Sequence, residues 1–403
     1  MFTRIIWIVL DSVGIGPLPD AHEYGDTASA EVAKLGRGRN TLGHIAKERA
    51  QQAAPLRLPN LVKLGLANIA SLEGLAAPAR PLGCFGRAAT HSPGKDTTTG
   101  HWEMAGIWLD QAFPVYPEGF PRELIEQYER AIGRKTLGNK PASGTEIIKE
   151  LGEEHVRTGY PIVYTSGDSV FQVAAHEDVL PIAELYRICD IARKMLDGKH
   201  RVGRVIARPF AGAPGNFKRT ERRHDYAVEP PRPMLMDVLA ERKVPVFGVG
   251  KIHDIYNGRG VDDYITTKNN ADGMAKLHEA LKRQSRGLIF ANLVDFDMLY
   301  GHRKDVAGFA QSLEEFDVML APLLDALEAS DLLMITADHG CDPCPCSSST
   351  DHSREYVPIV TYSRAGKSGV DLGTRATLAD MGQAVAENFG GTLKVGASFL
   401  AAM

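Results

Sequence analysis

The stretch Met334-Ile-Thr-Ala-Asp-His-Gly-Cys341, near the C-terminus, does most to decide the fold. Its apolar part, Leu332–Ile335, predicts a buried strand, and the chain then turns polar at Asp338-His339-Gly340. A carboxylate and an imidazole directly after a parallel strand lie at the edge of an α/β sheet where ligands usually bind. An isolated Asp-His pair usually makes only a loop hydrogen bond. A metal site is therefore indicated only if the arrangement recurs.

The arrangement recurs at two more predicted strands. Arg4–Leu10 is a mainly apolar run that stops at Asp11, and Gly287–Val294 is another that leads into Asp295, Asp297 and His302. A further His352 follows in a Ser-rich loop. The candidate ligands are three carboxylates and three imidazoles: Asp11, Asp297, Asp338, His302, His339 and His352. Mixed oxygen and nitrogen ligands in this number suit two divalent ions better than one structural zinc. Two such ions, about 4 Å apart, form a clamp for phosphoryl oxygens.

Composition excludes several classes of protein. The chain has 403 residues, 44% hydrophobic and 24% charged, which is typical of a soluble globular protein with two or three domains. A formal net charge of -4 gives no reason to expect nucleic acid or an anionic membrane as partner. No apolar run approaches the roughly 20 residues of a membrane helix, and the N-terminal run lacks a signal-peptide cleavage site. Five cysteines make no disulfide framework. We therefore expect a cytoplasmic protein.

Alternating strand and helix patterns predict an α/β core made from both ends of the chain. Helical spacing of apolar residues marks Val306–Ala329 as a core helix rather than a site. Further strands are expected at Val244–Val249 and Pro358–Tyr362, and further helices at Ala271–Arg283 and Thr377–Phe389.

The middle of the chain has a different character, with more Pro, Gly and charge between proline-rich borders. It contains strand candidates at Ile162–Thr165 and Val202–Ala207. All the candidate metal ligands lie on either side of it. We therefore predict a core in two parts, 1–112 and 233–403, with 113–232 inserted as a domain that caps the site.

A second unusual stretch, Gly94–Met104, suggests a nucleophile. Three threonines follow Asp96 and open into a segment compatible with a helix, which places hydroxyls near a helix N-terminus that favours anions. For Thr98 and Thr99 a capping role is the better interpretation. For Thr97 the metal cluster changes the balance, because a hydroxyl bound to a divalent cation is deprotonated easily enough to act as a nucleophile.

These motifs together closely resemble a known family. The matching segments, in order, are Asp11, Lys95–Glu103, Asp297 with His302, Thr336–Gly340 and Thr350–Tyr356. They are similar to those of the prokaryotic phosphopentomutases of the alkaline phosphatase superfamily, over essentially the whole chain. The resemblance implies an alkaline-phosphatase-like α/β core with a mainly parallel sheet flanked by helices, an inserted α/β cap domain, and two metal ions, usually manganese.

The resemblance also implies roles for individual residues. In the related cofactor-independent phosphoglycerate mutases the motif is Asn-Ser-x-x-Gly-His, and aligning its Gly-His with Gly100-His101 places the nucleophile on Thr97. One metal would be held by Asp11, Asp338 and His339, and the other by Asp297, His302 and His352, with phosphorylated Thr97 bridging them. Asp295 competes with Asp297, and only the family spacing to His302 decides between them. The residues expected to bind substrate are Ser166, Asp168, Val170, Arg204, Ile206, Arg219 and Lys251.

Two features leave alternatives open. Arg204 and Arg219 lie in a basic stretch and could be solvated charges, as a lone arginine usually is. The loop before Thr350 is longer than the family usually has and contains Cys344 and Cys346, which with Cys341 imitate a zinc knuckle. A fourth ligand is missing, so we favour the two-metal interpretation, although spacing alone does not exclude zinc. This insertion also leaves the pose of His352 open.

The function implied by the resemblance is isomerisation of α-D-ribose 1-phosphate to ribose 5-phosphate, with the deoxyribose pair also accepted. Phospho-Thr97 would give its phosphoryl group to the sugar, forming a 1,5-bisphosphate, and a sugar bisphosphate would prime the enzyme. The partner is thus a small phosphosugar, with no obligate protein partner implied. The alternatives are a metal-dependent phosphatase or another phosphosugar mutase on the same scaffold, because fold and metal cluster are shared. A metal-binding protein without catalytic activity is a further alternative, and in such a protein Thr97 would have no role as a nucleophile.

Overall fold

The chain folds into two compact units. A computed structural model describes residues 1–26, 38–344 and 349–403. Unit 1 comprises Met1–Ala112 and Pro230–Met403, and unit 2 comprises Phe113–Glu229. Unit 2 is thus inserted in the sequence of unit 1, and its second border falls at the start of the proline-rich Glu229–Pro233. Within the described ranges, no helix is long and apolar enough to cross a membrane.

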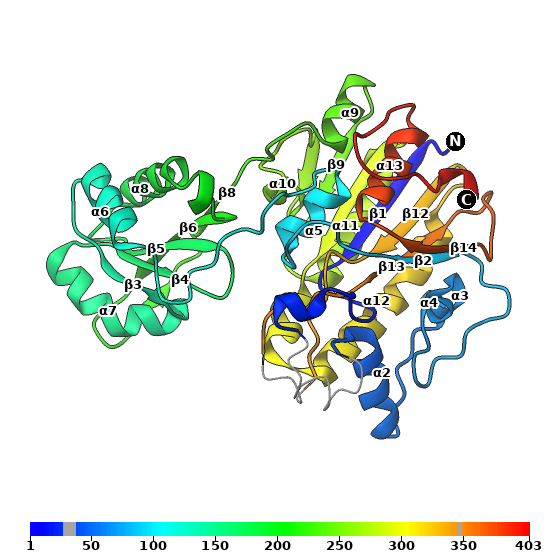
Figure 1. Ribbon diagram of the computed structural model, residues 1–403, viewed down its shortest axis with the longest axis horizontal. Coiled ribbons are helices and arrows are strands. Elements are labelled where there is room, and N and C mark those ends of the chain that lie inside the picture. The colour runs from blue at the N-terminus through cyan, green and yellow to red at the C-terminus, as the bar shows by residue number, and fades with distance from the viewer. Residues whose placement is uncertain (27–37, 345–348) are drawn as a thin grey trace. The chain divides into compact units, whose positions relative to one another are not determined.

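Unit 1 is built on an eight-stranded sheet in the order β10-β9-β11-β1-β12-β13-β2-β14 (Figure 1). Its centre is parallel, because β1 (Arg4–Leu10) pairs in the same direction with β11 (Gly287–Leu293) and β12 (Asp331–Thr336). Only β13 runs antiparallel to its neighbours. The outer strands are β9 (Val246–Val249), β10 (Asp263–Ile265), β13 (Val357–Tyr362), β2 (Cys84–Ala88) and β14 (Asp371–Arg375).

Register aligns the ends of the three central strands. Arg4 lies opposite both Gly287 and Asp331, so β11, β1 and β12 begin together and also end together. Every residue of all three strands is buried, which explains why their sequences are continuous apolar runs rather than alternating ones. The residues that directly follow β1, β11 and β12 therefore lie at the same edge of the sheet.

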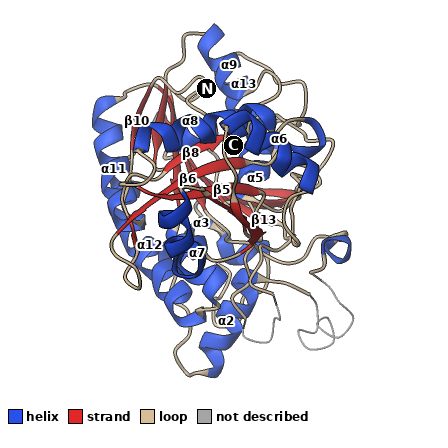
Figure 2. Ribbon diagram, turned by 90° about the vertical axis from the view of Figure 1, so that its left-hand side faces the viewer, coloured by secondary structure: helices blue, strands red, loops and turns tan. Residues whose placement is uncertain are grey.

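Helices cover both faces of this sheet (Figure 1). Helices α11 (Asn270–Arg283) and α12 (Val306–Ala326) pack on each other on one face, and Figure 2 shows them along one side of the strands. The same layer contains α2 (Thr41–Gln51), α3 (Pro59–Leu64) and α4 (Leu66–Ile69). The opposite layer contains α5 (Thr97–Met104), α9 (Leu235–Glu241), α10 (Ile252–Ile255) and α13 (Ala379–Asn388). This layered architecture is the α/β core expected from the sequence.

Unit 2 is a smaller α/β unit with a six-stranded sheet in the order β3-β4-β5-β6-β7, with β8 also paired to β6. Its strands are β3 (Leu137–Pro141), β4 (Ile162–Thr165), β5 (Val170–His176), β6 (Arg204–Ala211), β7 (Lys218–Arg219) and β8 (His224–Ala227). One face packs against α6 (Arg122–Ile132) and α8 (Ile182–Met195), and the other against α7 (Gly144–Thr158). The strand expected at Val202–Ala207 is displaced, because pairing with β5 carries β6 on through Pro209 to Ala211.

A buried histidine makes unit 2 sensitive to acid. The ring of His155 in α7 is fully buried, with Nδ1 2.7 Å from the carbonyl oxygen of Tyr160, while Nε2 accepts the backbone N–H of His176 at 2.8 Å. Because Nε2 must keep its lone pair to accept that bond, only the neutral ring fits. Burial lowers the pKa of His155, with smaller contributions from the charges of His176 and Arg134.

We therefore expect unit 2 to lose stability as the pH falls from about 7.5 to about 5. The unfolded chain takes up a proton near its ordinary pKa of about 6.5, whereas folded His155 does not until a lower pH, so the unfolded state binds more protons in this range. Pulse proteolysis in urea, scored by cleavage within residues 113–229, should show this slope. The slope should shrink in His155→Gln and persist in His22→Gln, whose side chain is 65% exposed. Equal slopes in all three proteins would contradict the assignment.

Candidate metal centre and nucleophile

The six candidate metal ligands gather at one edge of the central sheet of unit 1. Asp11 follows β1, Asp338 and His339 follow β12, and Asp297 lies in a π-helical turn (Phe296–Tyr300) after β11. His302 lies in the next short 3-10 turn (Gly301–Arg303), and His352 lies in the loop before β13. The aligned ends of the three central strands thus place ligands from residues 11 to 352 in one cluster.

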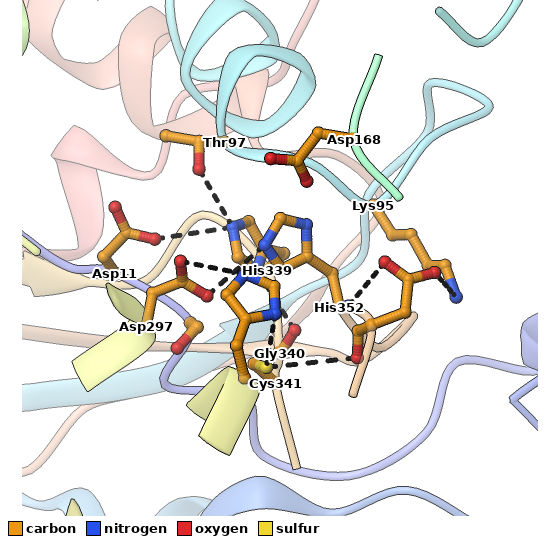
Figure 3. Close-up of polar contacts among 12 residues, drawn as sticks. Asp11, Lys95, Thr97, Asp168, Asp297, His339, Gly340, Cys341 and His352 are labelled. Carbon is orange, nitrogen blue, oxygen red and sulfur yellow. Dashed lines mark hydrogen bonds and ion pairs between the residues drawn. The ribbon is translucent and has the colours of Figure 1, made fainter. Parts of the chain in front are cut away.

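Distances divide the cluster into two groups. Asp11, Asp338 and His339 form one set with the spacing of metal ligands, and Nε2 of His339 lies 3.4 Å from Oδ1 of Asp11 and 3.5 Å from Oδ2 of Asp338. The other group centres on Asp297, whose two carboxylate oxygens each lie 3.3 Å from an imidazole, Oδ2 from His302 and Oδ1 from His352 (Figure 3). His339 and His352 link the groups, with ring centroids 4.1 Å apart.

Electrostatics of the buried carboxylates favour a cation. Burial raises the pKa of Asp11 well above its ordinary value, and the negative charges of Asp338 and Asp297 raise it further. Oδ1 of Asp11, Oδ1 of Asp297 and Oδ2 of Asp338 are buried and accept no hydrogen bond from a described residue. Buried carboxylate oxygens normally find a donor or a metal. The donor set therefore fits divalent cations, which prefer carboxylate and imidazole ligands.

The choice between Asp295 and Asp297 follows from their contacts. Oδ2 of Asp295 accepts the backbone N–H of Asn270 at 2.7 Å, and the amide oxygen of Asn270 accepts the N–H of Asp295 at 3.0 Å. Asp295 therefore joins the start of α11 to the end of β11, whereas Asp297 contacts both histidines of its group. Geometry favours Asp297 as the ligand.

Thr97 lies at the start of α5, directed at the cluster. Its hydroxyl oxygen is 3.3 Å from Nε2 of His339, the atom that also faces Asp11 (Figure 3). The expected capping role of Thr98 and Thr99 is wrong, because Asp96 is the N-cap and accepts the backbone N–H of Thr99 at 3.0 Å and its hydroxyl at 2.6 Å. An acidic cap holds the first turn of α5 in place and leaves Thr97 directed at the ligands.

His101 connects the turn of Thr97 to the metal cluster. Its ring is fully buried, and Nδ1 lies 2.9 Å from the carbonyl oxygen of Thr97 and 3.2 Å from Oδ2 of Asp338. A Cβ on neighbouring Gly100 would collide with the backbone oxygen and Cβ of Asp338, so only glycine allows α5 to approach this loop. The Gly-His pair therefore sets how closely α5, with the candidate nucleophile, packs on the loop of Asp338.

Glu355 ties together the loops that carry the ligands. Its carboxylate is buried and accepts hydrogen bonds from the backbone N–H of Gly16 and from Thr41 and Ser353. Burial raises its pKa to about 7, and the nearby charge of Asp342 contributes. A Cβ on Gly340 would collide with this carboxylate. The loops after β1 and β12 and before β13 therefore converge on one buried acid.

Arg354 braces the segment that leads to Thr97. Its side chain is 3% exposed, lies 2.8 Å from Asp20 and stacks on the ring of Tyr24 at 4.3 Å. Its guanidinium also donates to three backbone carbonyl oxygens, those of Thr90 at 2.9 Å, Ser92 at 2.7 Å and Gly94 at 2.6 Å. One buried side chain thus fixes the backbone of residues 90–94.

We expect Arg354→Met to lower the free energy of unfolding of unit 1 by about 3 kcal/mol, because it leaves buried carbonyl oxygens without donors. The matched control in the same unit is Arg283→Met, which removes an ion pair with Glu279 whose arginine is 50% exposed and should change stability by less than about 0.5 kcal/mol. Urea unfolding followed by tryptophan fluorescence measures both, since all three tryptophans lie in unit 1. Similar losses in the two variants would show that Arg354 is not the brace.

Most of the expected substrate residues lie in unit 2. Ser166 and Asp168 occupy the loop between β4 and β5, and Val170 begins β5 opposite Arg204 of β6. Asp168 and Arg204 form an ion pair at 3.5 Å. The remaining positions are Ile206 in β6, Arg219 in β7 opposite Phe210 at the far end of β6, and Lys251 after β9 in unit 1. The structure thus brings Asp168, Val170 and Arg204 together at one end of β6. Arg219, in β7, is paired with the opposite end of β6.

Lys251 lies near the cluster: burial and two neighbouring carboxylates raise the pKa of Asp11, and the positive charge of Lys251 offsets a small part of that rise. The thiol of Cys341 also lies beside the cluster, 4.0 Å from Nδ1 of His302 and within ligand spacing of His302 and Asp297. Cys346, the third thiol of the alternative zinc site, lies outside the described residues. Cys344, the second of these thiols, is disulfide-bonded, so it has no free thiolate for zinc and the three-thiol alternative is wrong.

Comparison with known proteins places this geometry in a family. The model of the Metalloenzyme superfamily matches residues 3–392, so the chain belongs to that superfamily and its cluster is that of a metalloenzyme. Among curated relatives, the phosphopentomutase of Carboxydothermus hydrogenoformans is 56% identical and that of Caldanaerobacter subterraneus subsp. tengcongensis is 54% identical. The first alignment covers 98% of each chain, and the second covers 99% of this chain and 98% of the relative. The chain therefore belongs to the phosphopentomutase family, and it is an enzyme of the isomerase class that transfers phosphoryl groups.

A solved structure is also similar. Leishmania mexicana phosphoglycerate mutase, crystallised at low cobalt concentration, shares 13% identity over 97% of this chain and 96% of that chain, with a TM-score of 0.46. The family assignment confirms the resemblance and the alkaline-phosphatase-like fold class expected from the sequence.

Proposed function

We propose that this enzyme interconverts α-D-ribose 1-phosphate and ribose 5-phosphate, and the corresponding deoxyribose phosphates, through a phosphorylated Thr97. The observation that carries the proposal is the Thr97 hydroxyl at the N-terminus of α5, 3.3 Å from His339 in a cluster of buried carboxylates and imidazoles. The identity of 54–56% with curated phosphopentomutases supports the choice of sugar phosphates as substrates.

We assign Asp11, Asp338 and His339 to one divalent cation and Asp297, His302 and His352 to a second, with manganese as the preferred ion. Their buried, unbonded carboxylate oxygens support this assignment. Bound there, the cations would neutralise phosphoryl oxygens and lower the pKa of the threonine hydroxyl. Second contacts hold the ligands in place, since Oδ1 of Asp338 accepts the backbone N–H of Ser12 and of His339, both at 3.1 Å.

The chain's own residues then account for two phosphoryl transfers. Phospho-Thr97 gives its phosphoryl group to the 5-hydroxyl of ribose 1-phosphate; the bond from phosphorus to Oγ breaks, a bond to the sugar oxygen forms, and the hydroxyl proton passes to Oγ. The resulting 1,5-bisphosphate turns round and returns the 1-phosphoryl group to Thr97, leaving ribose 5-phosphate. Thr97 is the first residue of α5, so it lies at the positive end of the helix dipole, which favours negative charge there. A sugar bisphosphate supplies the first phosphoryl group.

We assign recognition of the sugar and of its second phosphate to Ser166, Asp168, Val170, Arg204, Ile206, Arg219 and Lys251. Asp168 and Arg204 already form an ion pair beside Val170, which supports a role for them in one site. Excluding water while the bisphosphate turns separates a mutase from a phosphatase, and we assign this capping role to unit 2. A hydrolytic phosphatase is the second candidate, since the metal cluster alone suits both reactions.

The proposal is tested by following ribose 1-phosphate with the enzyme, manganese and a hexose bisphosphate, using phosphorus NMR to separate the products. We expect ribose 5-phosphate to accumulate, a chelator to stop the reaction, and omission of the bisphosphate to leave a lag or a low rate. Release of inorganic phosphate in proportion to the ribose 1-phosphate consumed would favour the phosphatase, and no reaction of ribose 1-phosphate with any divalent metal would overturn the substrate assignment.

A further inference from the structure

His352 differs from the other candidate ligands in how the chain positions it. The others lie directly after a central strand or in the turns that follow β11, whereas His352 lies in the loop that leads into β13. On its C-terminal side this loop is fixed, because Ser353 and Gly340 exchange two backbone hydrogen bonds, at 2.7 and 3.1 Å. For the ring of His352 to face Asp297, the backbone on its N-terminal side must be held as well.

The carboxylate of Asp351 holds the backbone of His352 from that side. Its Oδ1 accepts the N–H of His352 at 2.9 Å, and its Oδ2 lies 3.1 Å from Nζ of Lys95, which extends toward this loop in Figure 3. The side chain of Asp351 is 46% exposed, so water would solvate it in many orientations if nothing held it. The ion pair with Lys95 therefore selects the orientation in which Oδ1 meets the N–H of His352.

Lys95 is anchored by contacts that do not involve Asp351. Its side chain is only 17% exposed, and its ammonium group donates to the carbonyl oxygen of Tyr24 at 3.1 Å and to Oδ1 of Asp26 at 2.9 Å. An ammonium group has three donors, and these contacts together with Asp351 use all three. Lys95 is therefore a fixed point against which the loop of His352 is held.

The second carboxylate bound to Lys95 holds the same loop further along. Oδ2 of Asp26 accepts the backbone N–H of Arg354, and the side chain of Asp26 is 3% exposed. Burial raises the pKa of Asp26, and the charge of Lys95 opposes this rise, so the lysine favours the charged form of the buried acceptor. The backbone N–H groups of His352 and Arg354 are thus each bonded to a carboxylate that pairs with Lys95.

A direct role of Lys95 at the reacting phosphate fits these contacts less well. Lys95 precedes Thr97 by two residues, so its charge would be a natural partner for a phosphoryl group on that threonine. Its ammonium is instead directed at a carbonyl oxygen and at two carboxylates. The observed contacts connect the segment of the nucleophile to the loop of His352.

We propose that Lys95 is a positioning residue for His352. Lys95, Asp26 and Asp351, which we call the lysine clamp, fix the backbone around His352, so that its Nε2 stays 3.3 Å from Oδ1 of Asp297. The clamp acts on one cation site through a ligand and contacts neither the cation nor the sugar. The inference rests on the proposed function in that His352 is taken as a ligand of the second cation.

Manganese binding tests the proposal. Metal-free full-length enzyme, prepared with a chelator, is titrated with Mn²⁺, and electron paramagnetic resonance of the free ion gives the affinity of each site. Asp351→Ala and Lys95→Met should each raise the dissociation constant of one ion by about tenfold or more, as expected when a residue that orients a metal ligand is removed. The affinity for the other ion should change by less than about threefold, because its ligands do not contact the clamp.

Three further variants separate positioning from a general loss of structure. His352→Ala should weaken binding of the same ion that the clamp variants weaken. Lys95→Arg keeps the positive charge and several donors, so it should retain the affinity for that ion to within about threefold of wild type. The matched control, Lys276→Met, removes a lysine of α11 that pairs with Glu279 at 3.0 Å and should leave both affinities unchanged.

Activity at saturating manganese gives a second measurement. A positioning residue acts through metal affinity, so excess Mn²⁺ should restore the isomerase activity of Lys95→Met to within about tenfold of wild type. Thermal unfolding shows whether each variant is folded. If Lys95→Met does not fold, Asp351→Ala decides the matter, because it removes a side chain that is 46% exposed.

Equal weakening of both ions, or no change for either ion in Asp351→Ala and Lys95→Met, would overturn the lysine clamp. A Lys95→Met enzyme that binds both ions normally but stays inactive at saturating manganese would overturn it too, because Lys95 would then act on the phosphoryl group itself. The isomerase assay of the wild type separates these failures from failure of the proposed function. Selective loss of one ion in the variants of an enzyme that does not isomerise ribose 1-phosphate keeps the clamp and refutes the substrate assignment.

Discussion

Replacing Thr97 with valine should lower isomerase activity by about 10⁴-fold or more while leaving the fold and both metal ions in place. Valine keeps the shape of threonine but lacks the oxygen that accepts the phosphoryl group. The hydroxyl makes one hydrogen-bonding contact, at 3.3 Å to His339, so its loss should cost little stability. Steady-state kinetics measures the activity of the variant, elemental analysis its metal content, and thermal unfolding its stability.

The control and the position of the phosphate sharpen this prediction. Thr98→Val changes the neighbouring threonine, which makes no hydrogen bond to a candidate metal ligand among the described residues, and should retain activity within about tenfold. Mass spectrometry of peptides from active enzyme should find phosphate on Thr97. Phosphate on Thr98 or Thr99 would mean that the nucleophile has been misassigned.

Removing a carboxylate ligand should act on metal binding as well as on rate. Asp338→Ala deletes a buried carboxylate that faces His339 and His101, so metal occupancy should fall and activity should drop by about 10³-fold or more. Asp338→Asn keeps an oxygen that can accept the backbone N–H groups of Ser12 and His339. It should therefore preserve the conformation of the loop while still lowering the affinity for the metal ion. His302→Ala should likewise lower occupancy.

Elemental analysis after dialysis distinguishes residues that bind the metal ions from residues that only lie near them. Asp295→Asn is the matched control, because Asp295 bonds to the start of α11 and not to the histidines. It should keep two metal ions per chain. Two full metal ions in Asp338→Ala or His302→Ala would show that the cluster has been misplaced.

The central strands and the clustering of the ligands could be predicted from sequence because both follow from local patterns. Arg4–Leu10 and Gly287–Leu293 are buried on both faces, so their apolar runs are continuous, and parallel pairing brings their polar ends together. In unit 2 only two of six strands were expected. β5 is buried along its whole length, but it directly follows the loop assigned to the sugar. β6 was expected, but it runs past its predicted end because it passes through Pro209, a residue that normally indicates the end of a strand.

The supports of the site could not be predicted because their partners are far apart in the sequence. Glu355 binds Thr41 across 314 residues, and Arg354 binds Asp20 across 334. No local pattern indicates that a charged residue is buried and fully bonded. Both residues lay inside a recognised motif, yet their role depends on three loops that only the folded sheet brings together. The cap of α5 was misassigned for a related reason, since Asp96 and Thr99 are both good capping residues and the backbone decides between them.

Single turnover of the phosphorylated enzyme tests the central claim most directly. Enzyme labelled with radioactive phosphate by a hexose bisphosphate is freed of the donor, mixed with unlabelled ribose 1-phosphate and quenched within milliseconds to seconds. If Thr97 gives its phosphoryl group to the sugar, label should leave the Thr97 peptide, appear first in ribose 1,5-bisphosphate and then in ribose 5-phosphate. Label that passes from the protein to inorganic phosphate without entering the sugar, or a protein that never takes up label, would contradict the account.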